Sequence, residues 1–167
     1  MIDARECHRL LAELGATVAT AESLTGGLLG AALTEWSGSS RIYRGGVVVY
    51  ATDLKHTLLG VPDDLLARLG PVDAETAIAM ADGVRDRLGA TYGLATTGVA
   101  GPDPLGDQPV GTVHVACAGP RHTQARGFGF DGGRSAIREA SVRAALELLQ
   151  DVLEARRAED RPGRSGT

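Results

Sequence analysis

Apolar residues along the chain recur at two spacings, one typical of helices and one typical of strands. Between Asp3 and Leu14 they recur every third or fourth position, which predicts a helix with Asp3 as its N-cap and Gly15 at its end. The same spacing returns in later segments that begin or end beside capping residues or glycines. It predicts a helix from the turn at 22–27 to about Trp36, a short turn or helix at 52–55, and helices over 73–88 and 135–155.

Short runs of β-branched and apolar residues between these helices predict the strands. They cover residues 17–21, 45–51, 92–97, 110–118 and 122–130. The last two alternate between apolar and polar positions and meet at Gly119-Pro120, which predicts a hairpin. The segment 58–62 is a connector, in which Pro62 opens a short turn around Leu65 and Leu66.

The order of these elements predicts the fold class. Crossover helices between early strands favour a parallel core, and the hairpin adds antiparallel strands. We therefore expect an α/β fold, a three-layer α/β/α sandwich with a mixed, mostly parallel sheet. Residues 1–156 form a single domain in this prediction, and 157–167, which are polar with Pro and Gly, form a disordered tail.

Composition narrows the class of protein. The 167 residues are 43% hydrophobic and 23% charged, enough to bury one core. A net charge of −4 and an aromatic content of 4% argue against nucleic acid as the partner. No apolar run is long enough to span a membrane, and Met1 to Glu6 carries no secretory signal. We therefore expect a cytoplasmic protein with a small-molecule substrate.

The sequence offers no metal site. Its two cysteines are too few for a disulfide framework and lack metal-ligand spacing, and its four histidines are scattered without a carboxylate cluster. We expect neither a metal nor another cofactor. The basic residues show one oddity, because Lys55 is the only lysine among 17 lysines and arginines.

Candidate chemistry gathers where predicted strands end, which is where open α/β folds bind their ligands. Ser23 follows the first strand and precedes a step into a helix through Thr25, Gly26 and Gly27. Unpaired backbone N–H groups near Thr25 to Gly27 suit the oxyanion of a serine nucleophile. The alternative is that Ser23 or Thr25 simply caps the helix.

Lys55 is the best candidate for the base that such a serine needs. It follows the second strand, at the same edge of the sheet as Ser23 if both strands are parallel. Its pKa must fall from about 10.4 towards 7–8 for this role, which arginine cannot achieve because it stays protonated. The alternative is an exposed charge at a helix start. Position 26 is glycine, so the S-x-x-K signature of penicillin-binding enzymes is absent.

Other residues at the same edge have two interpretations each. Tyr50 can relay a proton or orient the Lys55 ammonium, or it can be an aromatic residue at the rim of a strand. Thr97, Gly98 and Gly101 open a glycine-rich loop whose N–H groups suit an anion. Arg134 and Arg138 lie one turn apart at the start of the last helix, where they suit a phosphate or form ordinary surface charge.

These segments together resemble the CinA C-terminal domain family. Residues 21–27 (AESLTGG) resemble its A-E-S-C-T-G-G element, and 97–102 (TGVAGP) resemble its T-G-I-A-G-P element. Residues 109–113 (PVGTV) resemble part of its K-P-V-G-T-V strand. Residues 50–61 resemble its Y-x-x-x-x-K-x-x-L-L-G-V segment. The match covers about residues 4–155, with the elements in the same order. The chain therefore resembles the standalone form of the domain.

The resemblance implies nicotinamide-nucleotide amidase activity. Such an enzyme hydrolyses the carboxamide of nicotinamide mononucleotide to nicotinate mononucleotide and ammonia, which salvages pyridine nucleotide. The matched positions imply Ser23 as nucleophile, Lys55 as base, and Tyr50 and Thr97 nearby. The 5′-phosphate is then expected against Gly98 to Gly101, or on Arg134 or Arg138.

Two departures from the family pattern leave other functions open. Leu24 replaces a cysteine, and the loop 103–108 lacks the usual Gly-Gly pair, so substrate choice can differ. The alternatives are a nucleotide-binding module without catalysis, an interaction protein linked to DNA uptake or damage, and an amidohydrolase of another carboxamide. The apolar hairpin also leaves a homo-oligomer possible.

Overall fold

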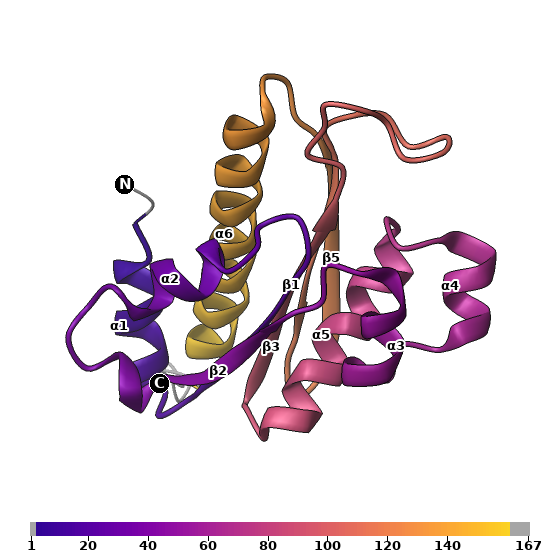
Figure 1. Cartoon of the computed structure of the whole chain (residues 1–167). Helices are drawn as coiled ribbons and strands as arrows, with labels where there is room; N and C mark the ends of the chain where they lie inside the picture. Colours follow the sequence, from indigo (N-terminus) through magenta and orange to yellow (C-terminus); the bar gives the residue numbers. More distant parts are fainter. Residues whose placement is uncertain (1–2, 161–167) are drawn as a thin grey trace, which may run out of the picture.

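One five-stranded sheet organises the molecule, with helices on both of its faces (Figure 1). The computed structural model describes residues 3–160. The strand order is β2-β1-β3-β4-β5. Strands β2, β1 and β3 run parallel, whereas β4 is antiparallel to both β3 and β5. The strands are β1 (Val18–Glu22), β2 (Tyr43–Val48), β3 (Tyr92–Gly98), β4 (Thr112–Ala118) and β5 (Thr123–Gly129). The mixed sheet and the hairpin are confirmed.

The helices divide between the two faces of the sheet and complete the predicted sandwich. One layer contains α1 (Arg5–Glu13), α2 (Leu28–Thr34) and α6 (Arg134–Asp160). The other contains α3 (Thr52–Leu59), α4 (Asp63–Leu69) and α5 (Ala74–Leu88). A 3₁₀ turn (Ser39–Arg41) leads into β2. Among residues 3–160, no helix combines the length and the apolar character needed to cross a bilayer.

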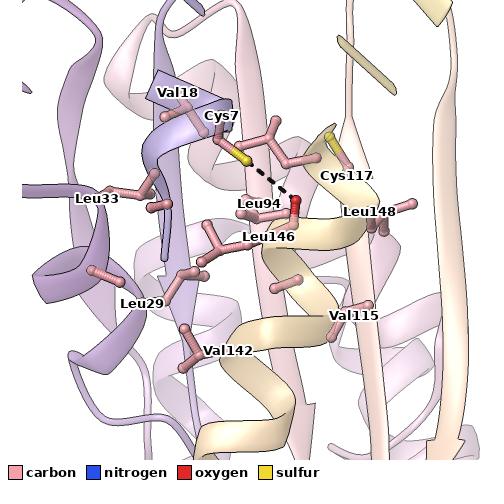
Figure 2. Packing of buried hydrophobic residues seen from close by; sticks show 14 of the residues in the cluster. Cys7, Val18, Leu29, Leu33, Leu94, Val115, Cys117, Val142, Leu146 and Leu148 are labelled. Atoms are coloured by element: carbon pink, nitrogen blue, oxygen red, sulfur yellow. Dashed lines mark hydrogen bonds between the residues drawn. The ribbon is translucent and has the colours of Figure 1, made fainter. Parts of the chain in front are cut away.

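Each face of the sheet has its own apolar core, because successive side chains of a strand point to opposite faces. Val18 and Leu94 pack under α1, α2 and α6, whereas Ala19 and Ala95 pack under α3 to α5. Figure 2 shows the first of these cores, where Cys7 Sγ donates a hydrogen bond to the Leu146 carbonyl at 3.3 Å. Burial raises the pKa of Cys7 and of Cys117 to about 12, which makes both thiols poor nucleophiles.

The structure differs from the sequence prediction at some boundaries. The turn expected after Pro62 is the helix α4, with Pro62 at its N-cap and acidic residues in its first turn. β2 starts and ends earlier than predicted, because it pairs with β1 only as far as Val48. The N-cap of α1 is Ala4 rather than Asp3, although the Asp3 carboxylate accepts a hydrogen bond from Arg5 N–H.

The predicted tail is partly helical. α6 continues through Asp160, where ion pairs such as Arg156 with Asp160 follow its last turns. Residues 157–160 therefore belong to the helix, and 161–167 lie outside the described residues.

Close contact between β3 and α5 depends on Gly93. A Cβ atom at this position would lie 2.0 Å from the Ala81 carbonyl oxygen, which is helix backbone and cannot move aside. Glycine thus allows the helix to lie directly on the strand. Since β3 ends at the candidate site and α5 supports it, this contact fixes the relative position of the two elements.

We expect Gly93→Ala to lower the free energy of unfolding by about 1–3 kcal/mol, the usual cost of overpacking a core. The matched control is Gly129→Ala on β5, where a Cβ would meet nothing within 4 Å. Urea denaturation of both variants measures the difference. Equal stability of the two variants would contradict this account of the β3–α5 contact.

Candidate active site

The carboxyl ends of β1 and β3 and the segment after β2 surround one pocket of about 280 Å³. The start of α6 and the long loop after β3 lie at the same end of the domain (Figure 1). The pocket is lined by Ser23, Leu24, Tyr50, Thr52, Lys55, Pro71, Val72, Thr97, Gly98, Val99, Ala100, Gly101, Asp103, Pro104, Leu105 and Arg134. Most of the residues singled out in the sequence therefore share a single cavity.

Ser23 and Lys55 are in direct contact at this pocket. Lys55 Nζ donates hydrogen bonds to Ser23 Oγ at 3.2 Å and to the Val49 carbonyl oxygen at 3.0 Å. The Lys55 side chain comes from the first turn of α3 and is 1% exposed, whereas Ser23 is 7% exposed. The exposed-charge alternative for Lys55 is therefore wrong.

Burial sets the protonation of Lys55. Both hydrogen-bond partners of Nζ are neutral oxygens, so no anion compensates for the lost hydration of an ammonium. Desolvation accordingly lowers the pKa of Lys55 to about 8. A useful fraction of the amine is thus neutral near physiological pH, which is what a proton acceptor requires.

Tyr50 lies at the mouth of the pocket, and its hydroxyl is not a hydrogen-bond partner of the Lys55 amine. Its side chain is 59% exposed, and its hydroxyl accepts a hydrogen bond from Arg134 Nη2 at 2.8 Å. Arg134 also donates through Nη1 to the Gly101 carbonyl. One guanidinium therefore connects the segment after β2, the loop after β3 and the start of α6.

The structure separates the two arginines that the sequence offered for a phosphate. Arg134 stands on the pocket wall. Arg138 instead donates to the Leu24 carbonyl from Nε and to the Thr25 carbonyl from Nη2, each at 3.0 Å. Arg138 thus holds two carbonyl groups of the turn that carries Ser23 and does not line the pocket.

Two of the amides expected to face an oxyanion are paired inside the protein. Gly26 N–H donates to the Ser23 carbonyl, and Gly27 N–H donates to the Glu22 carboxylate at 2.9 Å. Glu22 also accepts from the N–H groups of Leu29 and Gly30, so it caps α2 in the place of Ser23 or Thr25. The Thr25 hydroxyl meets that of Thr96 at 2.8 Å.

Thr97 and Gly98 form the opposite wall. Thr97 is 1% exposed, and its hydroxyl donates to the Pro71 carbonyl at 2.6 Å, which ties the end of β3 to the segment before α5. Gly98 allows β4 to approach, because a Cβ there would lie 2.6 Å from the Thr112 carbonyl oxygen. Within the described residues, the N–H groups of Ala100 and Gly101 donate to no protein acceptor and remain available to a ligand.

Sequence reasoning missed Glu22 and the wall formed by Pro71 and Val72. Glu22 is 2% exposed, and its signal was a carboxylate at the end of an otherwise uncharged buried strand, which must find donors. Pro71 and Val72 carried no comparable signal, because only the tertiary fold brings them to the pocket.

Metal ligands do not gather anywhere in residues 3–160. No three side chains among the histidines, cysteines, aspartates and glutamates of that range come close enough to hold an ion.

Comparison with known proteins gives a consistent result. The model of the CinA C-terminal domain matches residues 3–153. A CinA-like protein of Frankia casuarinae is 54% identical over 144 residues, which is 86% of this chain and 33% of that protein. A putative competence-damage inducible protein of Desulforamulus reducens is 47% identical over 87% of this chain and 36% of its own length. The chain therefore spans about a third of these relatives.

Solved structures agree with the sequence matches. The competence/damage inducible protein CihA from Agrobacterium tumefaciens superposes with a TM-score of 0.84 at 39% identity, covering 90% of this chain and 94% of that one. A CinA superfamily protein from Klebsiella pneumoniae 700603 gives a TM-score of 0.88 at 30% identity, covering 91% and 96%. With the family model matching nearly the whole described range, the chain belongs to the CinA C-terminal domain family.

Proposed function

We propose that the chain is a nicotinamide-nucleotide amidase that hydrolyses the carboxamide of nicotinamide mononucleotide to nicotinate mononucleotide and ammonia. The observation that carries this proposal is the contact between a buried lysine amine and a serine hydroxyl in a pocket. Such a pair suits acyl transfer, in which a hydroxyl nucleophile needs an adjacent base. The choice of nicotinamide mononucleotide as the substrate rests on the resemblance of the sequence motifs to those of the family.

The proposed first step uses the contact between Lys55 and Ser23. Neutral Nζ takes the hydroxyl proton while Oγ bonds to the carboxamide carbon, and the carbonyl oxygen becomes an oxyanion. The resulting ammonium then gives its proton to the amide nitrogen, the C–N bond breaks, and ammonia leaves. In the second step Lys55 takes a proton from a water molecule whose oxygen bonds to the acyl carbon, and the bond between that carbon and Ser23 Oγ then breaks. Lys55 returns the proton to Oγ, which restores the serine and releases nicotinate mononucleotide.

No histidine competes with Lys55 for this role in the described residues. His56 is the nearest in sequence, but its Nδ1 meets the Val61 carbonyl at 2.8 Å and it does not line the pocket. The substrate contributes as well, because the positive charge of the pyridinium ring makes the carboxamide carbon more electrophilic.

Arg134 is the side chain that suits the 5′-phosphate. It stands on the pocket wall, and its guanidinium is exposed beside Gly101. The unpaired N–H groups of Ala100 and Gly101 would add donors on the same side. Arginine and backbone amides are common phosphate ligands.

Removal of either member of the pair tests the proposal directly. We expect Ser23→Ala and Lys55→Arg each to reduce ammonia release from the mononucleotide by at least about 10³-fold, since both act as one unit. Ser40→Ala, an exposed serine outside the pocket, serves as the control. Wild-type rates in both pocket variants would exclude this mechanism, and tight binding without turnover in the wild type would favour a binding module.

The pH dependence of kcat/KM gives a second test. Because the proposed base is the neutral amine and burial lowers the pKa of Lys55 to about 8, kcat/KM should rise with pH through about 8 and then level off. Steady-state assays from pH 6 to 10 measure the profile. A rate that is independent of pH across this window would argue against a lysine base.

Arg134→Gln tests the phosphate subsite. Loss of a charge-assisted hydrogen bond should raise KM for the mononucleotide about 10- to 100-fold, while nicotinamide riboside, which lacks the phosphate, should be little affected. Arg143→Gln, on the same helix and with Glu139 as its one ion-pair partner among residues 3–160, is the matched control. An equal effect on both substrates would show that Arg134 does not bind the phosphate.

A further inference from the structure

The turn that carries Ser23 leaves very few backbone N–H groups free. Ser23 N–H donates to the Thr96 carbonyl in the sheet, and Gly26 N–H donates back to the Ser23 carbonyl. Leu28 N–H donates to the Thr25 carbonyl as α2 begins. These bonds remove three donors that a serine nucleophile at a strand end would otherwise have near it.

Glu22 removes three more. Its Oε2 accepts from the N–H groups of Gly27 and Leu29 at 2.9 and 3.1 Å, and its Oε1 accepts from Gly30 N–H at 2.8 Å. The carboxylate is 2% exposed, so it meets these amides without competition from water. The positive end of α2 is therefore occupied by the protein's own anion and is closed to a ligand.

Only two amides between Ser23 and Gly30 have no acceptor in the described part of the chain, those of Leu24 and Thr25. Both peptide planes that carry them are anchored through their carbonyl oxygens. The Ser23 carbonyl is held by Gly26 N–H, and the Leu24 carbonyl is held by Arg138 Nε. In a trans peptide the N–H points opposite to the C=O, so each anchor fixes the direction of one free N–H.

We infer that Glu22 is a positioning residue, acting with Arg138, which leaves the Leu24 amide as the oxyanion donor on the pocket for attack by Ser23. The inference rests on the proposed function. Leu24 lines the pocket beside Ser23, as a donor next to the nucleophile requires, whereas Thr25 is fully buried and does not line it. This assignment also narrows the set of oxyanion donors predicted from the sequence, because the N–H groups of Gly26 and Gly27 already have acceptors inside the protein.

Glutamine at position 22 would disturb this arrangement with almost no change in shape. Its amide has one oxygen that accepts and one NH₂ group that only donates. At least one N–H among Gly27, Leu29 and Gly30 would then face a donor in a buried place. The turn must shift to relieve that contact, and the Leu24 amide shifts with it.

The test compares the oxygen and sulfur forms of the substrate in Glu22→Gln. Nicotinamide mononucleotide and thionicotinamide mononucleotide both release ammonia, but sulfur is larger and accepts weaker hydrogen bonds than oxygen. We expect kcat for the oxygen substrate to fall about 100-fold with little change in KM. The preference for oxygen over sulfur should shrink at the same time, because a misplaced donor no longer distinguishes the two.

Two further variants complete the experiment. Glu35→Gln, an exposed carboxylate at the C-terminal end of α2, should keep wild-type values for both substrates. Arg138→Lys keeps the charge but cannot span two carbonyls, so it should reduce the oxygen preference in the same way as Glu22→Gln. It also provides the readout if Glu22→Gln does not fold.

The possible failures are distinguishable. A wild-type chain that releases no ammonia from either substrate overturns the proposed function, and this role of Glu22 with it. An active wild type whose oxygen preference stays unchanged in Glu22→Gln and Arg138→Lys overturns the positioning role alone, whether or not kcat falls. An unchanged inflection in the pH profile, together with a reduced oxygen preference, supports it.

Discussion

Burial of the Lys55 amine is the constraint on which the rest of the site depends. Nζ lies between Ser23 Oγ and the Val49 carbonyl oxygen, and the side chain is 1% exposed. An ammonium in such a place has lost most of its hydration without gaining an anion, which favours the neutral amine. The two apolar cores must therefore be stable enough to hold an unfavourable charge, since the free energy that depresses its pKa is taken from folding.

Glu22 shows the opposite solution for a buried ionisable group. It sits one residue before Ser23, but on the other face of β1, where three amides surround its carboxylate. Because backbone N–H groups hydrogen-bond both oxygens of its carboxylate, Glu22 stabilises the start of α2. A charged Lys55 ammonium, in contrast, is unfavourable at the start of α3 because no anion accompanies it. The end of β1 and the start of α3 thus place a fully hydrogen-bonded carboxylate and an amine without a charged partner on either side of the turn that carries Ser23.

Much of this arrangement was predictable from particular residues. The motifs around Ser23, Lys55 and Thr97 indicated one edge of a parallel sheet, and the structure brings all three to one pocket. The different positions of Arg134 and Arg138 were not predictable, because helical spacing places both near the site. Only tertiary contacts put Arg134 on the pocket wall and Arg138 against the carbonyl of Leu24. The same holds for Tyr50, whose hydroxyl meets Arg134 across a distance of 84 residues in sequence.

The burial of β1 on both faces has a consequence for folding. All five of its residues are buried, so apolar patterning alone scarcely distinguishes the correct pairing from one displaced by a residue. Polar side chains supply that distinction. A slip of one position would turn Glu22 towards the core under α3 to α5, away from its amides, and would break the hydrogen bond between Thr20 and Tyr43. The buried hydrogen bonds of Glu22 and Thr20 therefore also set the register of β1, because a misaligned strand would leave both side chains without their partners.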